Sequence, residues 1–70
     1  MPKKIRELKQ MLVKAGFKLL PGRGKGSHSV YAHPLLEEKA TIAGKDNKNA
    51  KRYQEQRVKQ LITEAKKRER

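Results

Sequence analysis

Cysteine and tryptophan are absent from the sequence, and its aromatic side chains are limited to Phe17, Tyr31 and Tyr53. Without cysteine, neither a disulfide nor a thiolate metal site can stabilise the chain. No apolar run is longer than three residues, which argues against a membrane-spanning helix and against the apolar segment of a secretory signal. We therefore expect a cytoplasmic protein with a thin core built from few large side chains.

Acidic residues are scarce in a chain of 70 residues, a length that predicts one small domain over residues 1–70. Seven Asp and Glu stand against nineteen Lys and Arg, which gives a net charge of +12. Residues 1–35 hold eight bases and one acid, and residues 36–70 hold eleven bases and six acids, so the charge is not confined to a tail. Such a balance indicates a polyanionic partner. Nucleic acid is favoured over a membrane, because no segment combines strong apolarity with a basic face.

The apolar residues near the start of the chain recur at helical spacing. They predict a helix over residues 3–15 with one apolar face, formed by Ile5, Leu8, Leu12 and Ala15. Gly16 follows as a natural C-terminal cap, because glycine readily adopts a positive φ.

Three short segments in the middle of the chain have the composition of strands. Residues 17–20, 27–33 and 39–43 are apolar, β-branched or aromatic, and each is followed by or ends near proline or glycine. Alternation along the second segment places His28 on one face and His33 on the other. The composition of the two faces does not indicate which of them is buried.

A second helix is predicted from residue 50 onward. Its apolar stripe consists of Ala50, Tyr53, Val58, Leu61, Ile62 and Ala65. Either Asp46 or Asn49 could cap its first turn. Tyr31 and Tyr53 are both expected to be at least partly buried, and stacking on RNA bases is the less favoured role. The order α-β-β-β-α predicts an α+β fold, a three-stranded antiparallel sheet with two helices on one face.

Two groups of cations are candidate phosphate ligands. Arg23 and Lys25 alternate with glycines in the loop before the second strand, a string that matches neither a phosphate-binding P-loop nor a dinucleotide fingerprint. Its backbone N–H groups and two cations could still hold a phosphodiester, and a plain hairpin connection is the alternative. Lys45, Lys48 and Lys51 could line a phosphate track at the start of the second helix, or simply be solvated there.

His28 and His33 are the only histidines, and they point to opposite faces of one strand. Because neither cysteine nor a carboxylate cluster accompanies them, we expect no metal and no other cofactor. A single histidine can act as general base or acid on a ribose 2′-hydroxyl or a leaving oxygen. His28 is the better candidate, because it lies beside the glycine-containing loop and its two cations.

The string Gly26-Ser27-His28, followed after four residues by His33-Pro34 and preceded by an amphipathic helix and Gly16-Phe17, resembles the HicA-type toxins of type II toxin–antitoxin systems. The resemblance covers residues 3–43 well and the second helix in outline. The stretch after the third strand departs from the family, because Gly44-Lys45-Asp46 and a long charged helix replace its usual Pro- and His-containing segment.

The resemblance implies a double-stranded-RNA-binding-like fold and a metal-independent endoribonuclease that cleaves mRNA and arrests translation. It also implies neutralisation by a cognate HicB-type antitoxin and a catalytic role for His28. Two other interpretations stay open: a non-catalytic double-stranded-RNA-binding module with the same basic face, and a degenerate relative that only binds protein.

Overall fold

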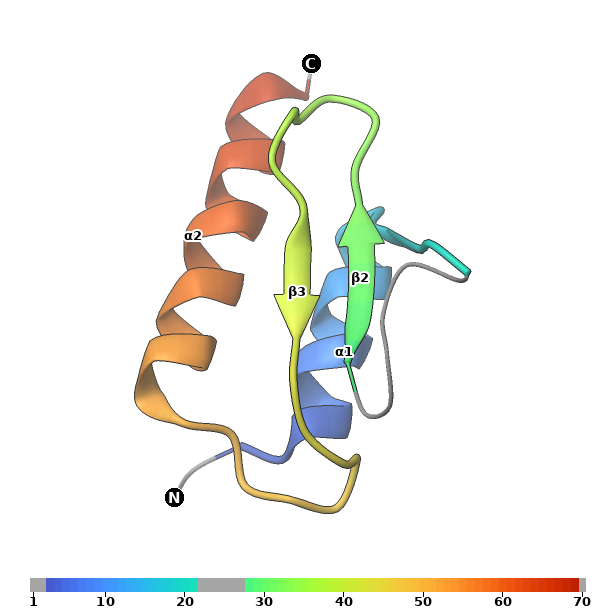
Figure 1. The fold of residues 1–70 in the computed structure, drawn as a ribbon. Coiled ribbons are helices and arrows are strands. Elements are labelled where there is room, and N and C mark those ends of the chain that lie inside the picture. Colours follow the sequence, from blue (N-terminus) through green and yellow to red (C-terminus); the bar gives the residue numbers. More distant parts are fainter. Residues whose placement is uncertain (1–2, 22–27, 70) are drawn as a thin grey trace.

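The computed structural model describes residues 3–21 and 28–69. Its elements follow in the order α1 (Ile5–Lys14), β1 (Lys18–Leu19), β2 (Ser29–Ala32), β3 (Ala40–Ile42) and α2 (Arg52–Arg68). The strands form one antiparallel sheet in the order β1-β2-β3 (Figure 1). This confirms the predicted α+β class and the α-β-β-β-α order, although the first four elements are shorter than predicted. Within the described ranges, no helix is long and apolar enough to cross a membrane.

The strand register shows which face of β2 is buried, a point that the sequence left open. Tyr31 pairs with Ala40, and both side chains are buried against the helices. Val30 pairs with Thr41 on the opposite face, where Thr41 is exposed. Because side chains alternate along a strand, His28 belongs to the same open face as Val30.

Both helices pack on the buried face of the sheet, as predicted. Eleven buried apolar residues of the described ranges form one cluster, to which both helices and the sheet contribute: Ile5, Leu8, Leu12, Phe17, Tyr31, Ala40, Ile42, Ala50, Val58, Leu61 and Ala65. In Figure 1, α1 lies behind the strands and α2 runs beside β3. The open face of the sheet carries neither helix.

The end of α1 is the glycine cap that the sequence predicts. Gly16 has φ +100°, and its N–H donates to the carbonyl of Val13 at 3.1 Å. The next N–H, that of Phe17, donates to the carbonyl of Leu12 at 2.9 Å. These two bonds make a Schellman motif, in which the buried residues Leu12 and Phe17 provide the accompanying apolar contact.

The segment between β3 and α2 closes the first turn of α1. The N–H of Ile5 donates to the carbonyl of Lys48 at 2.9 Å, and the N–H of Arg6 donates to the carbonyl of Asp46 at 3.2 Å. The first N–H groups of a helix have no partner inside the helix, so these carbonyls satisfy donors that would otherwise need water or a side chain. The Lys9 ammonium lies 2.6 Å from the Asp46 carboxylate and adds an ion pair to this contact.

The start of α2 differs from the prediction. Its N-cap is Lys51, so the prediction of Asp46 or Asn49 as the cap is wrong. The buried amide of Gln54 organises this turn instead. Its Oε1 accepts the N–H of Lys51 at 2.8 Å, and its Nε2 donates to the carbonyl of Ala43 at 2.9 Å. Gln54 therefore ties the beginning of α2 to the end of β3.

Tyr31 is buried as expected, but the prediction that Tyr53 belongs to the buried stripe of α2 is wrong, because 64% of its surface is exposed. The inward face of α2 is set by Val58 and Leu61. Gln54 lies four positions before Val58 and shares its face, whereas Tyr53 is rotated about 100° further around the helix.

Candidate functional site

His28 lies immediately before β2, at the open face of the sheet, and its side chain is exposed to solvent. The pair formed by Ser29 and Ile42 places His28 level with Ala43, where β3 ends. Figure 1 shows that the start of β2 and the connection from β3 to α2 lie at the same end of the sheet. An exposed imidazole in this position can exchange protons with a bound substrate.

Three of the predicted phosphate ligands lie on the connection that begins beside His28. Lys45, Lys48 and Lys51 all have exposed side chains, and none of them forms an ion pair with another described residue. The backbone bonds to α1 hold the connection in place, while the lysine side chains extend into solvent. The fold therefore brings these lysines to the end of the sheet that carries His28.

Arg23 and Lys25, the other two predicted phosphate ligands, lie outside the described residues. Their place relative to His28 stays a prediction from the sequence, in which both precede it by a few positions.

Two further cations on the open face were missed by the sequence analysis. Lys18 pairs with Ala32, which lies on the same face of β2 as His28. Continuing the register of β2 and β3 by one residue places Lys39 on the other side of Ala32. Both lysines are exposed, about 13 Å along the strand from His28 at roughly 3.3 Å per residue. Only the strand register links them to His28, so composition could not have found them.

The second histidine, His33, is part of the core. Only 5% of its surface is exposed, and its ring packs edge-on against Phe17 with ring centroids 5.0 Å apart. Its Nδ1 accepts the N–H of Leu35 at 3.1 Å. A Cβ atom at Gly16 would lie 3.1 Å from the Nε2 of His33. These contacts give His33 a packing role, on the face of β2 opposite His28.

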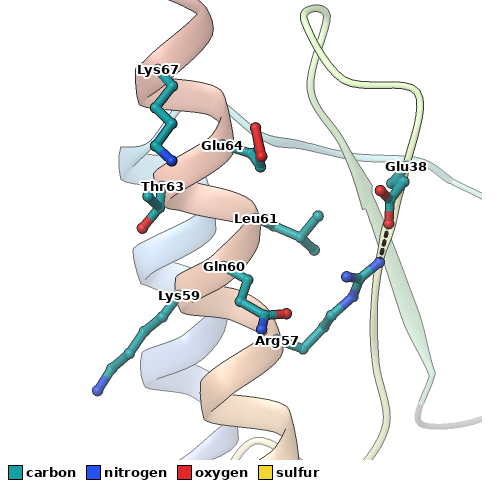
Figure 2. A pocket seen from close by; sticks show the side chains of 8 residues that line it. All are labelled: Glu38, Arg57, Lys59, Gln60, Leu61, Thr63, Glu64 and Lys67. Atoms are coloured by element: carbon teal, nitrogen blue, oxygen red, sulfur yellow. Dashed lines mark hydrogen bonds and ion pairs between the residues drawn. The ribbon is translucent and has the colours of Figure 1, made fainter.

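The cavity in Figure 2 lies along α2 and differs in character from the surface around His28. It has a volume of about 510 Å³ and is lined by cations and carboxylates together. Arg57 reaches from α2 to pair with Glu38, whereas Lys59 points away from the sheet (Figure 2). Mixed charges do not form a site for a polyanion, so this cavity is not the candidate site. Within residues 3–21 and 28–69, no group of three or more His, Asp or Glu side chains could hold a metal ion.

The fold and this basic end of the sheet define a small α+β domain with one exposed histidine beside a lysine-bearing connection. The family model of the HicA toxin of bacterial toxin–antitoxin systems matches residues 5–66, and the chain therefore belongs to this family. The match runs through most of α2 and so extends beyond the residues that carry the sequence motif. Searches of curated proteins and of solved structures find no match.

The packing role of His33 makes a prediction about stability. We expect His33→Ala to lower the free energy of unfolding by about 2 kcal/mol, because it removes buried ring contacts and leaves the N–H of Leu35 without its acceptor. Urea denaturation followed by circular dichroism measures the loss. His28→Ala is the matched control, since the same truncation at an exposed position should change stability by no more than about 0.5 kcal/mol. Equal stability of the two variants would contradict this role.

Proposed function

We propose that this HicA-family toxin is an endoribonuclease that cleaves mRNA in the cytoplasm and arrests translation, without a metal ion or another cofactor. The observation that supports the proposal is the exposed His28 at the end of the sheet where Lys45, Lys48 and Lys51 gather. A proton-transfer group and a set of unpaired cations are what phosphodiester cleavage by a ribose hydroxyl needs.

The reaction that fits these groups is internal transesterification. The ribose 2′-oxygen forms a bond to the adjacent phosphorus, and the bond from phosphorus to the 5′-oxygen breaks. The products are a 2′,3′-cyclic phosphate and a free 5′-hydroxyl. His28 either removes the 2′-hydroxyl proton, while water protonates the leaving 5′-oxygen, or protonates the 5′-oxygen, while water takes the 2′-hydroxyl proton. The second histidine, His33, is buried on the other face of β2 and takes neither role. Lysine ammonium groups stabilise the negative charge that develops on the phosphorane, a role that we also assign to Lys25 and Arg23.

The alternative function is a non-catalytic double-stranded-RNA-binding module, which the α-β-β-β-α order and the lysines would equally suit. The two functions differ in their dependence on His28. A toxin hinders growth when it is expressed alone, and this effect requires His28. A binding module does not hinder growth, and its RNA binding does not require His28.

We predict that His28→Ala lowers the rate of RNA cleavage by about 10²–10⁴-fold, the usual contribution of a general acid or base. The rate is measured on end-labelled RNA in gels, and growth arrest is scored in parallel. Because His28 is exposed, circular dichroism should show an unchanged fold. Leu35→Ala is the control, since it truncates a 43% exposed side chain just beyond the other end of β2. Wild-type cleavage by a folded His28→Ala protein would refute the assignment.

We also predict that RNA affinity falls steeply with salt, because lysines that contact phosphates release counterions. With about four contacts, the slope of log K against log salt on single-stranded RNA should be roughly −3, at about −0.7 per contact. Replacing Lys45 and Lys48 by glutamine should flatten it to roughly −1.5. The measurement uses His28→Ala protein, so that the RNA stays intact.

A double variant that replaces Lys59 and Lys67 by glutamine is the control for charge. These exposed cations lie on α2, beside the cavity of Figure 2, and their loss changes the net charge equally. Equal slopes for the two double variants would mean that RNA does not use the connection between β3 and α2.

A cognate HicB-type antitoxin completes the proposal. An acidic antitoxin would be steered to the lysines around His28 and would cover the surface that RNA uses. We predict that the product of the adjacent reading frame co-purifies with this chain and that the complex neither binds nor cleaves RNA. Charge reversal at Lys45 should weaken both RNA and antitoxin binding. A complex that cleaves RNA at the rate of the free toxin would exclude inhibition by occlusion.

A further inference from the structure

A second cavity opens at the basic end of the molecule, where α2 begins. Its volume is about 310 Å³, near the lower limit of the roughly 300–1,000 Å³ typical of small-ligand pockets. The buried side chains of Ile5 and Gln54 contribute to its lining. Lys48, Lys51 and Tyr53 also line it, and all three are exposed residues. The cavity therefore combines an apolar lining, two cations and one aromatic ring.

Tyr53 borders open space on two sides. It lines the cavity of about 310 Å³, and it also lines a small cleft of about 50 Å³ that lies between β3 and α2, next to Thr41 and Arg57. With 64% of its surface exposed, the side chain is available to a flat group from solvent. Stacking on an exposed aromatic ring is how proteins hold unpaired nucleic-acid bases, whatever the base sequence.

The backbone around the cavity is fixed before any ligand binds. The amide of Gln54 uses its oxygen for the N–H of Lys51 and its nitrogen for the carbonyl of Ala43. On the other side, the carbonyl of Lys48 accepts the N–H of Ile5. Both lysines of the cavity are thus anchored through their backbones while their ammonium groups stay exposed, and little backbone entropy remains to be lost on binding.

The positive charge at the cavity favours a negatively charged ligand. None of the described carboxylates lines it, whereas Lys48 and Lys51 do, and Lys45 is exposed on the same connection. A ligand that carries both a flat, partly apolar group and negative charges suits a cavity with this lining. A nucleotide within a single RNA strand has these properties, with its base between two phosphates.

We propose that the cavity beside Tyr53 is a nucleotide subsite, in which one unpaired base of the substrate stacks on the Tyr53 ring and its flanking phosphates contact Lys48 and Lys51. This proposal rests on the proposed nuclease function and names its substrate class as single-stranded RNA. A base inside a duplex is stacked on its neighbours and cannot reach the ring, because duplex RNA is contacted through its shape, phosphates and 2′-hydroxyls.

The test compares binding of a fluorescently labelled oligoribonucleotide, single-stranded or annealed to its complement, to proteins that all carry His28→Ala. Tyr53→Leu, which removes the aromatic ring, should weaken single-strand binding by about tenfold to a hundredfold. Tyr53→Phe keeps the ring and should bind as tightly as the parent. Val13→Ala, which trims a 58% exposed side chain on α1, is the control for a general loss of apolar surface. Circular dichroism confirms that each variant is folded.

A double-mutant cycle tests direct contact. One base at a time is removed from the oligonucleotide, leaving an abasic sugar. At the position that stacks on Tyr53, base removal and Tyr53→Leu should together cost no more than either change alone, because both delete the same contact. Additive losses at every position, or equal losses with single-stranded and duplex RNA, would overturn the subsite.

The lysine contacts have their own control. Lys51→Gln should weaken single-strand binding several-fold more than Lys59→Gln, which makes the same charge change on α2 outside the cavity. Equal effects of the two substitutions would overturn the phosphate contact at Lys51.

Cleavage assays separate this proposal from the nuclease assignment. A protein whose cleavage requires His28 but whose KM is unchanged by Tyr53→Leu would be a nuclease without this subsite, which overturns the present proposal alone. A protein that cleaves no RNA but binds single strands through Tyr53 would keep the subsite and lose the nuclease function.

Discussion

The structure depends on a single apolar layer, which lies between the two helices and one face of the sheet. Only 34% of the residues are apolar and only three are aromatic, which is enough to cover one face of the sheet with two helices but not both faces. Val30 and Thr41 therefore belong to a face without a helix. His28 belongs to that face as well, so its access to solvent follows from the size of the core. His33, five residues on and just past the other end of β2, lies on the opposite face by the alternation of side chains and is buried.

The basic end of the molecule depends on hydrogen bonds of the main chain. The carbonyls of Asp46 and Lys48 complete the first turn of α1, and the Gln54 amide ties α2 to β3. These bonds fix the path of a polar connection that carries several positive charges and whose Ala50 joins the core. Repulsion between Lys45, Lys48 and other nearby lysines is tolerated because their side chains extend into water, where like charges are screened.

The sequence was sufficient wherever a short-range pattern decides the outcome. Periodicity identified both helices, and the glycine cap at Gly16 and the opposite placement of the two histidines followed from local rules. The cap of α2 was mispredicted because Asp46 is engaged by α1, a contact between distant segments. Tyr53 was misplaced because a step of one residue turns a side chain by about 100° around a helix. Lys18 and Lys39 were missed because the strand register is a property of the whole sheet.

The contacts of the N-terminal segment also bear on the order in which parts of the chain can fold. The N–H of Ala50 donates to the carbonyl of Lys3 at 2.7 Å, and Lys4 forms an isolated β-bridge with Asn49. The bridge closes the loop between Lys4 and Asn49. The length-dependent part of the entropy cost of closing such a loop is about 3 kcal/mol, so the bridge forms only with support from the core. On the ribosome, the first N–H groups of α1 gain these carbonyl partners only after residues forty or more positions later have been made, and the core gains the side chains of α2 later still. The core cluster is therefore complete only once the residues of α2 have been added to those of α1 and the sheet.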